Sequence, residues 1–172
     1  MSSYISGSLG DRTTASGFDI QGPAPLPSDW TTSMNQRSAP HVVTAGSDGL
    51  ELTSAHVGVI TVDSSAAKID LTLPLVSGNA GLWYKVILIG TGTASDIRTA
   101  SSENKMKGSI IFHTDGAVPQ ITGHAAGDLI TFAADAVIGS TIDLSCDGTF
   151  WNVLGHGAYG GAVDKITLTQ ES

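Results

Sequence analysis

Short runs of β-branched and aromatic residues follow one another from His41 to the C-terminus. Segments such as GVITVD (58–63) and STIDLSC (140–146) alternate apolar and polar residues, which is typical of a strand with one buried face. Turn formers such as GSDG and DSSA separate the runs, which recur roughly every eight to twelve residues. This spacing predicts an all-β fold: an antiparallel β-sandwich or closed barrel with almost no helix.

The predicted strands share this texture and cover residues 41–45, 50–55, 58–63, 68–74, 82–90, 96–100, 108–114, 118–123, 128–134, 140–146, 149–155 and 165–170. LWYKVILIG (82–90) is the most apolar of them and predicts a strand that is buried on both faces.

Residues 1–40 have a different composition from the rest of the chain. They hold four of the six prolines and many Ser and Thr residues, and they show no sustained period of 2 or 3.6 residues. Such a segment buries too little apolar surface on itself to offset its ordering entropy. Its apolar residues are scattered as separate anchors, which are Tyr4, Ile5, Leu9, Phe18, Ile20, Leu26 and Trp30. We therefore predict an extended N-terminal arm (1–40) that contacts another surface, followed by a β-sandwich domain (41–172); the alternative is a leader that folds back onto its own domain.

Charge and hydropathy exclude several kinds of partner. Only 14% of the residues are charged, against about 25% in typical soluble domains. The formal net charge is −8 and no stripe of Lys and Arg exists, so nucleic-acid binding is not expected. The longest apolar run, VILI (86–89), is too short to span a membrane, and the N-terminus lacks the pattern of a signal peptide. We expect no membrane partner and synthesis in a cytoplasm.

GHGAYG (155–160) matches the dinucleotide-binding pattern G-x-G-x-x-G. That site needs a strand before the glycines and a helix after them, so that the helix N-terminus meets the pyrophosphate. The residues that follow have β-branched character, so the match is interpreted as accidental. The glycines are expected to allow positive φ angles and a sharp exit from the strand.

No residue pattern selects a catalytic or metal site. Cys146 lies in an alternating strand and is interpreted as a small core residue, with a nucleophile as the alternative. The five histidines are dispersed, without the spacing of a zinc site, and no G-x-S-x-G sequence is present. We expect no catalytic residues, no metal and no cofactor, and a protein that is not an enzyme.

The segment DGTFWNVLG (147–155) predicts a hairpin that closes the domain. Asp-Gly is a favoured tight-turn pair, and alternation puts Trp151 and Val153 on one face and Asn152 and Leu154 on the other. Trp151 is interpreted as a core residue, with a sugar-binding platform as the alternative.

The stretches 69–114 and 139–157 together resemble a pattern in virion proteins of tailed phages, namely head decoration (cement) proteins and trimeric tail-fibre domains. The pattern has TLP, a glycine, an aromatic-rich strand, a glycine-containing strand and a terminal DGxxWxV. The matching positions are Leu73, Pro74, Gly81, Tyr84, Val86, Gly108, Ile110, Asp147, Gly148, Trp151 and Val153.

The resemblance implies a jelly-roll-like sandwich that assembles as a homotrimer on the outside of a virion and is made in the cytoplasm of a bacterial host. The expected function is capsid decoration and stabilisation, with the major capsid protein as partner and with the arm laid over neighbouring subunits. The alternative is a receptor- or glycan-binding head or tail fibre domain, with Trp83 or Trp151 stacked on surface glycans. A third hypothesis is a small carbohydrate-active enzyme.

Overall fold

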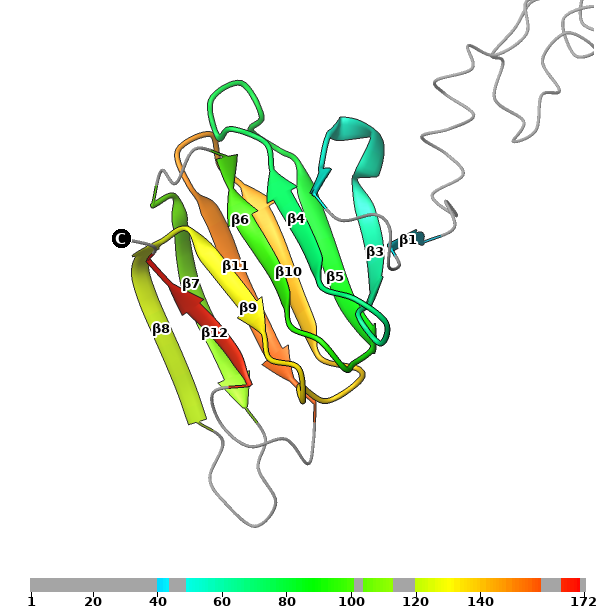
Figure 1. The fold of residues 1–172 in the computed structure, drawn as a ribbon. Coiled ribbons are helices and arrows are strands. Elements are labelled where there is room, and N and C mark those ends of the chain that lie inside the picture. The colour runs from blue at the N-terminus through cyan, green and yellow to red at the C-terminus, as the bar shows by residue number, and fades with distance from the viewer. Residues whose placement is uncertain (1–39, 44–48, 101–103, 113–119, 159–164, 171–172) are drawn as a thin grey trace, which may run out of the picture. The chain divides into compact units, whose positions relative to one another are not determined.

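The computed structural model describes residues 40–43, 49–100, 104–112, 120–158 and 165–170, which form two β-sheets packed as a sandwich (Figure 1). The seven-stranded sheet has the order β1 (His41–Val43), β3 (Gly58–Asp63), β5 (Trp83–Gly90), β10 (Thr141–Cys146), β11 (Trp151–Gly157), β7 (Met106–Phe112) and β8 (Gln120–Gly127). The five-stranded sheet has the order β12 (Ile166–Thr169), β9 (Leu129–Phe132), β6 (Ser95–Thr99), β4 (Ile69–Leu73) and β2 (Leu50–Glu51). The prediction of an all-β sandwich is confirmed.

Both sheets are mixed, whereas the sequence predicted antiparallel strands. Of the ten strand pairs in the described residues, five are parallel: β1–β3, β3–β5, β2–β4, β4–β6 and β7–β11. From β1 to β6 successive strands alternate between the two sheets, so each strand pairs with the one two places before it. A parallel pair needs a long crossover, and here the intervening strand of the opposite sheet provides it. The jelly-roll topology stays a prediction.

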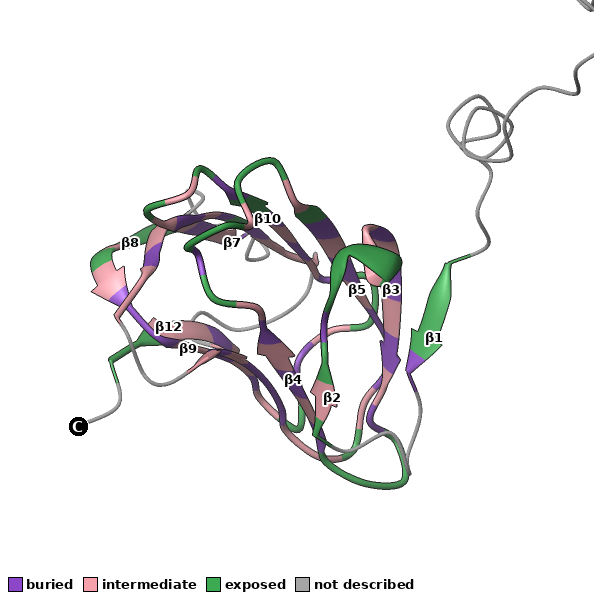
Figure 2. Ribbon diagram, turned by 90° about the horizontal axis from the view of Figure 1, so that it is seen from above, coloured by how far each residue is buried: buried purple, intermediate pink, exposed green. Residues whose placement is uncertain are grey.

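The core lies between the sheets, where the inward residues of both are buried (Figure 2). Strand β3 alternates buried and half-buried residues along its whole length, as the sequence predicted. Strand β5 does the same, so the prediction that it is buried on both faces is wrong: Trp83 is 48% exposed and Ile89 is 42% exposed. Its outward residues are Trp83, Lys85, Ile87 and Ile89, and because three of these four are apolar the sequence of β5 shows little alternation.

The residues that carry the resemblance hold the fold together at one end of the core. The indole Nε1 of Trp151 donates to the carbonyl oxygen of Pro74 at 3.2 Å, and the rings of Trp151 and Tyr84 lie 5.6 Å apart. The Tyr84 hydroxyl donates to the carbonyl oxygen of Thr53 at 3.0 Å, and burial raises the pKa of Tyr84 to about 12. These bonds join both sheets, so Trp151, Tyr84 and Pro74 specify packing in this chain.

The β10–β11 hairpin forms as predicted at the Asp-Gly pair. The carboxylate of Asp147 accepts the backbone N–H groups of Thr149 and Phe150 at 2.8 and 2.7 Å, and Gly148 has φ of +90°. Next to it, Gly108 on β7 lets that strand approach β11, because a Cβ atom there would lie 1.9 Å from the carbonyl oxygen of Val153. The turn thus fixes the register of β11 against β10, and Gly108 allows the close approach of β7 on the other side.

Candidate binding surface

The outer face of the seven-stranded sheet holds most of the large apolar side chains that are exposed in the described part of the chain. Alternation along the strands and the register between them place five on this face, namely Val42, Trp83, Ile89, Ile121 and Leu154. Ile121 is 66% exposed and Val42 is 58% exposed. Apolar side chains gathered on one face mark a surface that contacts a partner or ligand.

One row of this face crosses the sheet from edge to edge. The register links one residue from each strand, in the spatial order Val42, Thr61, Ile87, Thr141, His156, Ile111 and Ile121. We call this row the outer belt. None of its members is Asp, Glu, Lys or Arg. With strands about 4.8 Å apart, the belt is roughly 29 Å long.

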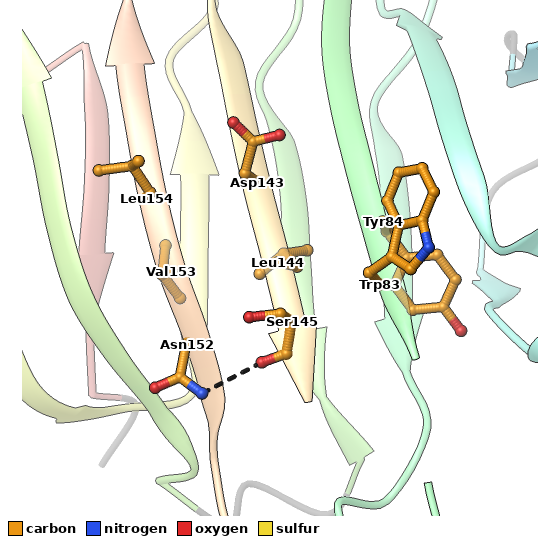
Figure 3. A pocket seen from close by; sticks show the side chains of 8 residues that line it. All are labelled: Trp83, Tyr84, Asp143, Leu144, Ser145, Asn152, Val153 and Leu154. Carbon is orange, nitrogen blue, oxygen red and sulfur yellow. Dashed lines mark hydrogen bonds between the residues drawn. The ribbon is translucent and has the colours of Figure 1, made fainter. Parts of the chain in front are cut away.

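A hollow of about 350 Å³ lies beside the outer belt. We call it the Trp83 hollow, and its lining residues are Trp83, Tyr84, Asp143, Leu144, Ser145, Asn152, Val153 and Leu154. Figure 3 shows Trp83 on β5 at one side, Asn152 and Leu154 on β11 at the other, and Asp143 and Ser145 on β10 between them. Ser145 is paired with Trp83 on one side and with Asn152 on the other. Because the side chain of Ser145 is shorter than those of its two neighbours, a depression remains between them.

Two of the polar side chains that line the Trp83 hollow, Asp143 and Asn152, already form hydrogen bonds or an ion pair with neighbouring residues. The ammonium group of Lys85 lies 3.1 and 3.2 Å from the two carboxylate oxygens of Asp143. The side-chain amide of Asn152 donates to the Ser145 carbonyl oxygen at 3.3 Å and to Asp147 at 3.1 Å. The Asn152 donors are therefore used locally, and the hollow offers mainly acceptor oxygens.

Beyond Asn152 the same face ends in a charged and aromatic cluster. Lys107 lies 3.4 Å from the Asp147 carboxylate and 4.2 Å from the centre of the Phe150 ring. The backbone N–H groups of Phe150 and Thr149 hold the pKa of Asp147 well below its ordinary value. Asp147 is thus a turn residue in its ionised form, and the cluster closes the hairpin end of the face.

The outer face of the five-stranded sheet has the opposite character. Asp96 lies at its centre with an 8% exposed side chain, and its carboxylate contacts Lys68 at 2.7 Å, Arg98 at 2.9 Å and Thr131 at 2.7 Å. Lys68 also contacts Asp70 at 3.0 Å. We call these five residues the Asp96 network. Burial raises the pKa of Asp96, but the hydrogen bonds outweigh burial and the pKa lies below its ordinary value.

The predicted arm residues lie outside the described residues. These are Tyr4, Ile5, Leu9, Phe18, Ile20, Leu26 and Trp30, so the arm stays a prediction. Of the two tryptophans considered for glycans, Trp151 is fully buried, which excludes it as a platform, while Trp83 is half exposed in its hollow. Cys146 is buried in the core as predicted, and its thiol lies 3.7 Å from the carbonyl oxygen of Val76.

The glycine pattern at 155–160 has a different structural role from the one expected. Gly155 and Gly157 lie inside β11, and neither is among the residues with positive φ, so the expected sharp exit at these glycines is wrong. A Cβ atom on Gly155 would lie 2.8 Å from side-chain atoms of Ile110 and Ile142. This glycine is needed for close packing, and the next described element is the strand β12.

Within the described ranges, no three His, Cys, Asp or Glu side chains are grouped so that they could hold a metal ion. Four of the five histidines fall in these ranges; His41 and His56 are in ring contact with centroids 4.8 Å apart, and His156 belongs to the outer belt. No helix among the described residues has the length and apolar character to cross a membrane.

Comparison of the chain with protein-family models, with curated proteins and with solved structures finds no match to any of them.

The sequence analysis missed the outer belt. Its members come from seven strands, and only the register brings them into one row. A signal was present in LWYKVILIG, where Ile87 and Ile89 follow the period of an outward face. The apolar run, however, predicts a strand buried on both faces, which assigns these positions to the core.

Proposed function

We propose that this chain is a structural virion protein that decorates and stabilises a phage capsid as a homotrimer and acts by binding rather than catalysis. The observation that carries the proposal is the outer belt, an uncharged row across a seven-stranded sheet. Burying an unpaired charge in an interface is costly, and the cores of interfaces are depleted of charge. A row without charge is suited to docking on another protein.

The partner we propose is the major capsid protein. The resemblance to head decoration proteins supports this partner, and the low charged fraction of 14% is compatible with a protein that works inside an assembly. The arm of each subunit adds a second contact, and three arms on one trimer raise avidity far above that of a single arm. The net charge of −8 keeps free trimers apart before they dock.

Charge introduced into the outer belt tests the proposal. Ile121→Lys and Val42→Lys change exposed side chains at the two ends of the belt, and Thr169→Lys is the matched control on the exposed outer face of the other sheet. In pelleting assays with capsids assembled without the protein, we expect either belt variant to bind at least tenfold more weakly and the control to bind like the wild type. Equal binding by all four proteins would contradict the role of the belt.

Mass measurement by light scattering separates the belt's role in docking from a role in assembly. The homotrimer has an expected mass of about 53 kDa, three times the chain mass of 17.6 kDa. We expect this mass for the wild type and for both belt variants. A wild-type monomer would overturn the homotrimer, and a loss of the trimer in the belt variants would assign the belt to contacts between copies.

Substitution in the arm tests the second contact. Phe18→Ser combined with Trp30→Ser in the full chain should weaken capsid binding while leaving the mass unchanged. Unchanged capsid binding by this double variant would remove the arm from the proposal and leave the belt as the docking surface.

A further inference from the structure

We propose that the Trp83 hollow binds one pyranose ring of a neutral glycan, as an activity separate from capsid docking through the outer belt. Three observations carry the inference: a half-exposed indole, a depression of about 350 Å³ beside it, and a set of acceptor oxygens on its floor and far wall. The volume falls within the range of about 300–1,000 Å³ that is usual for ligand sites.

The width of the hollow fits a flat, saturated ring. Strand β10 lies between β5 and β11, so Trp83 and Asn152, which share one row through Ser145, are two strand spacings apart, roughly 9.6 Å. One face of a pyranose ring presents C–H groups, which pack on the indole face, while the hydroxyl groups project from its edge. Leu154 lies two residues further along β11, in the row of Asp143, and adds apolar surface to the β11 side of the hollow.

The polar groups in the hollow match a ligand rich in hydroxyl groups. Asp143 presents carboxylate oxygens, Ser145 a hydroxyl group, and Asn152 its side-chain carbonyl oxygen, because its amide group donates to Ser145 and Asp147. Sugar hydroxyls donate to such acceptors. A neighbouring pair of hydroxyls on one ring can reach two of them at once, which fixes the orientation of the sugar.

The charge distribution selects a neutral sugar. Lys85 neutralises Asp143 within the hollow, and the chain as a whole carries a net charge of −8. A sialylated, sulfated or phosphorylated glycan would therefore meet an acidic protein without a free cation in the lining of the hollow. Neutral hexoses and N-acetylhexosamines lack this penalty.

Binding by the full-length wild-type chain is tested with methyl glycosides of glucose, galactose, mannose and N-acetylglucosamine. We follow the indole N–H resonance that is missing from the NMR spectrum of Trp83→Phe, and we expect saturable shifts for at least one sugar, with a Kd on the order of 1 mM because an open site holds a single ring. Sialic acid methyl glycoside should give no shift. Absence of saturation for every neutral sugar, at concentrations tenfold above this Kd, would overturn the inference.

Three variants locate the binding. Trp83→Ala should weaken it at least tenfold, Trp83→Phe should retain part of it, and Asp143→Asn should weaken it severalfold. Ile89→Ala is the matched control, since Ile89 lies on the same strand and face with similar exposure and outside the hollow. Affinities that are equal in Trp83→Ala and Ile89→Ala would place the sugar elsewhere and overturn the assignment.

Two further outcomes separate this inference from the proposed function. Trp83→Ala should bind capsids like the wild type, because Trp83 is not a member of the outer belt. If Trp83→Ala loses capsid binding and no sugar binds, the hollow belongs to the protein interface and the glycan assignment is wrong. Saturable shifts with an arginine-rich peptide and with no sugar would likewise replace the glycan by a peptide ligand.

Discussion

In both sheets of the sandwich, inward and outward residues alternate along the strands. The outward residues of the two sheets differ in their charge. On the five-stranded sheet the outward residues include the Asp96 network, whose charges are paired with one another at 2.7–3.0 Å. On the seven-stranded sheet the outer belt crosses every strand without a charged residue. The five-stranded face thus has a paired-charge cluster at its centre, whereas the seven-stranded face has an uncharged row and carries its charges beside that row, in the Lys85–Asp143 and Lys107–Asp147 pairs.

The two faces also hold carboxylates in different surroundings. The side chain of Asp96 is 8% exposed and is bonded to three neighbours, whereas the side chain of Asp143 is 42% exposed and, among the residues that the structure describes, is paired with Lys85. The first carboxylate stabilises a sheet, and the second lies in a hollow of about 350 Å³ between β5 and β11. The carboxylate on the five-stranded face is therefore buried within its own sheet, whereas the carboxylate on the seven-stranded face is exposed where a ligand could contact it.

The largest expected effect concerns the interior that both faces share. Trp151→Ala removes a fully buried indole, its contact with Tyr84 and its hydrogen bond to Pro74, so it should lower the free energy of unfolding by about 3–5 kcal/mol. Urea denaturation measures this value, with Trp151→Phe as the control that keeps a ring in the site. A loss below that of Trp151→Phe would show that the indole does not join the two sheets.

Next in size is the paired substitution of the two carboxylates. Asp96→Asn should lower the free energy of unfolding by about 1–3 kcal/mol, because it weakens three hydrogen bonds of a buried group. Asp143→Asn should cost about 0–1 kcal/mol, since its ion pair is exposed. Urea denaturation measures both values. Equal losses in the free energy of unfolding would contradict the proposed difference between the two carboxylates.

Acidification should reduce the contribution of Asp96. Its pKa is lower in the folded chain than in the unfolded chain, so its stabilisation is complete above the unfolded pKa of about 3.9 and is lost as the pH falls through the folded pKa. The difference in urea midpoint between wild type and Asp96→Asn should therefore shrink between about pH 6 and about pH 3. A difference that grows on acidification has the wrong sign and would contradict this role.

The smallest expected effect is the change in stability caused by a lysine on either outer face. Ile121→Lys and Thr169→Lys both change exposed side chains, so each should shift the free energy of unfolding by less than about 0.5 kcal/mol. Thermal and urea denaturation of both variants measure this. Equal stability would attribute their different capsid binding to the chemistry of the faces, whereas a marked loss in Ile121→Lys alone would make Ile121 a packing residue.

Strand positions were largely predictable because alternation is a local property. The predicted segment 58–63 is β3 residue for residue, and 140–146 contains β10. The prediction failed at 50–55, where β2 ends at Glu51 and a 3₁₀ turn (Ser54–His56) follows. There Thr53 caps the turn by accepting the N–H of Ala55, and its own N–H donates to His56 Nδ1. These local bonds compete with the strand.

The candidate site was predictable only in part. Trp83 was one of two tryptophans considered for glycans, and the sequence offered no means of choosing it over Trp151, since both lie in apolar strands. Ser145 and Asn152 stand on strands that are more than sixty positions away from Trp83 in the chain. Their approach depends on which strands pair and in which register, and neither follows from a local pattern.

By itself the sequence determined that the chain is all β, where most strands lie, and that the hairpin turns at Asp147 and Gly148, because alternation and turn chemistry act between near neighbours. Only the tertiary structure decided that the strands alternate between two mixed sheets, that the apolar strand β5 has an exposed face, and that seven uncharged residues form one row. The physical reason is that exposure and register depend on which distant strands become neighbours.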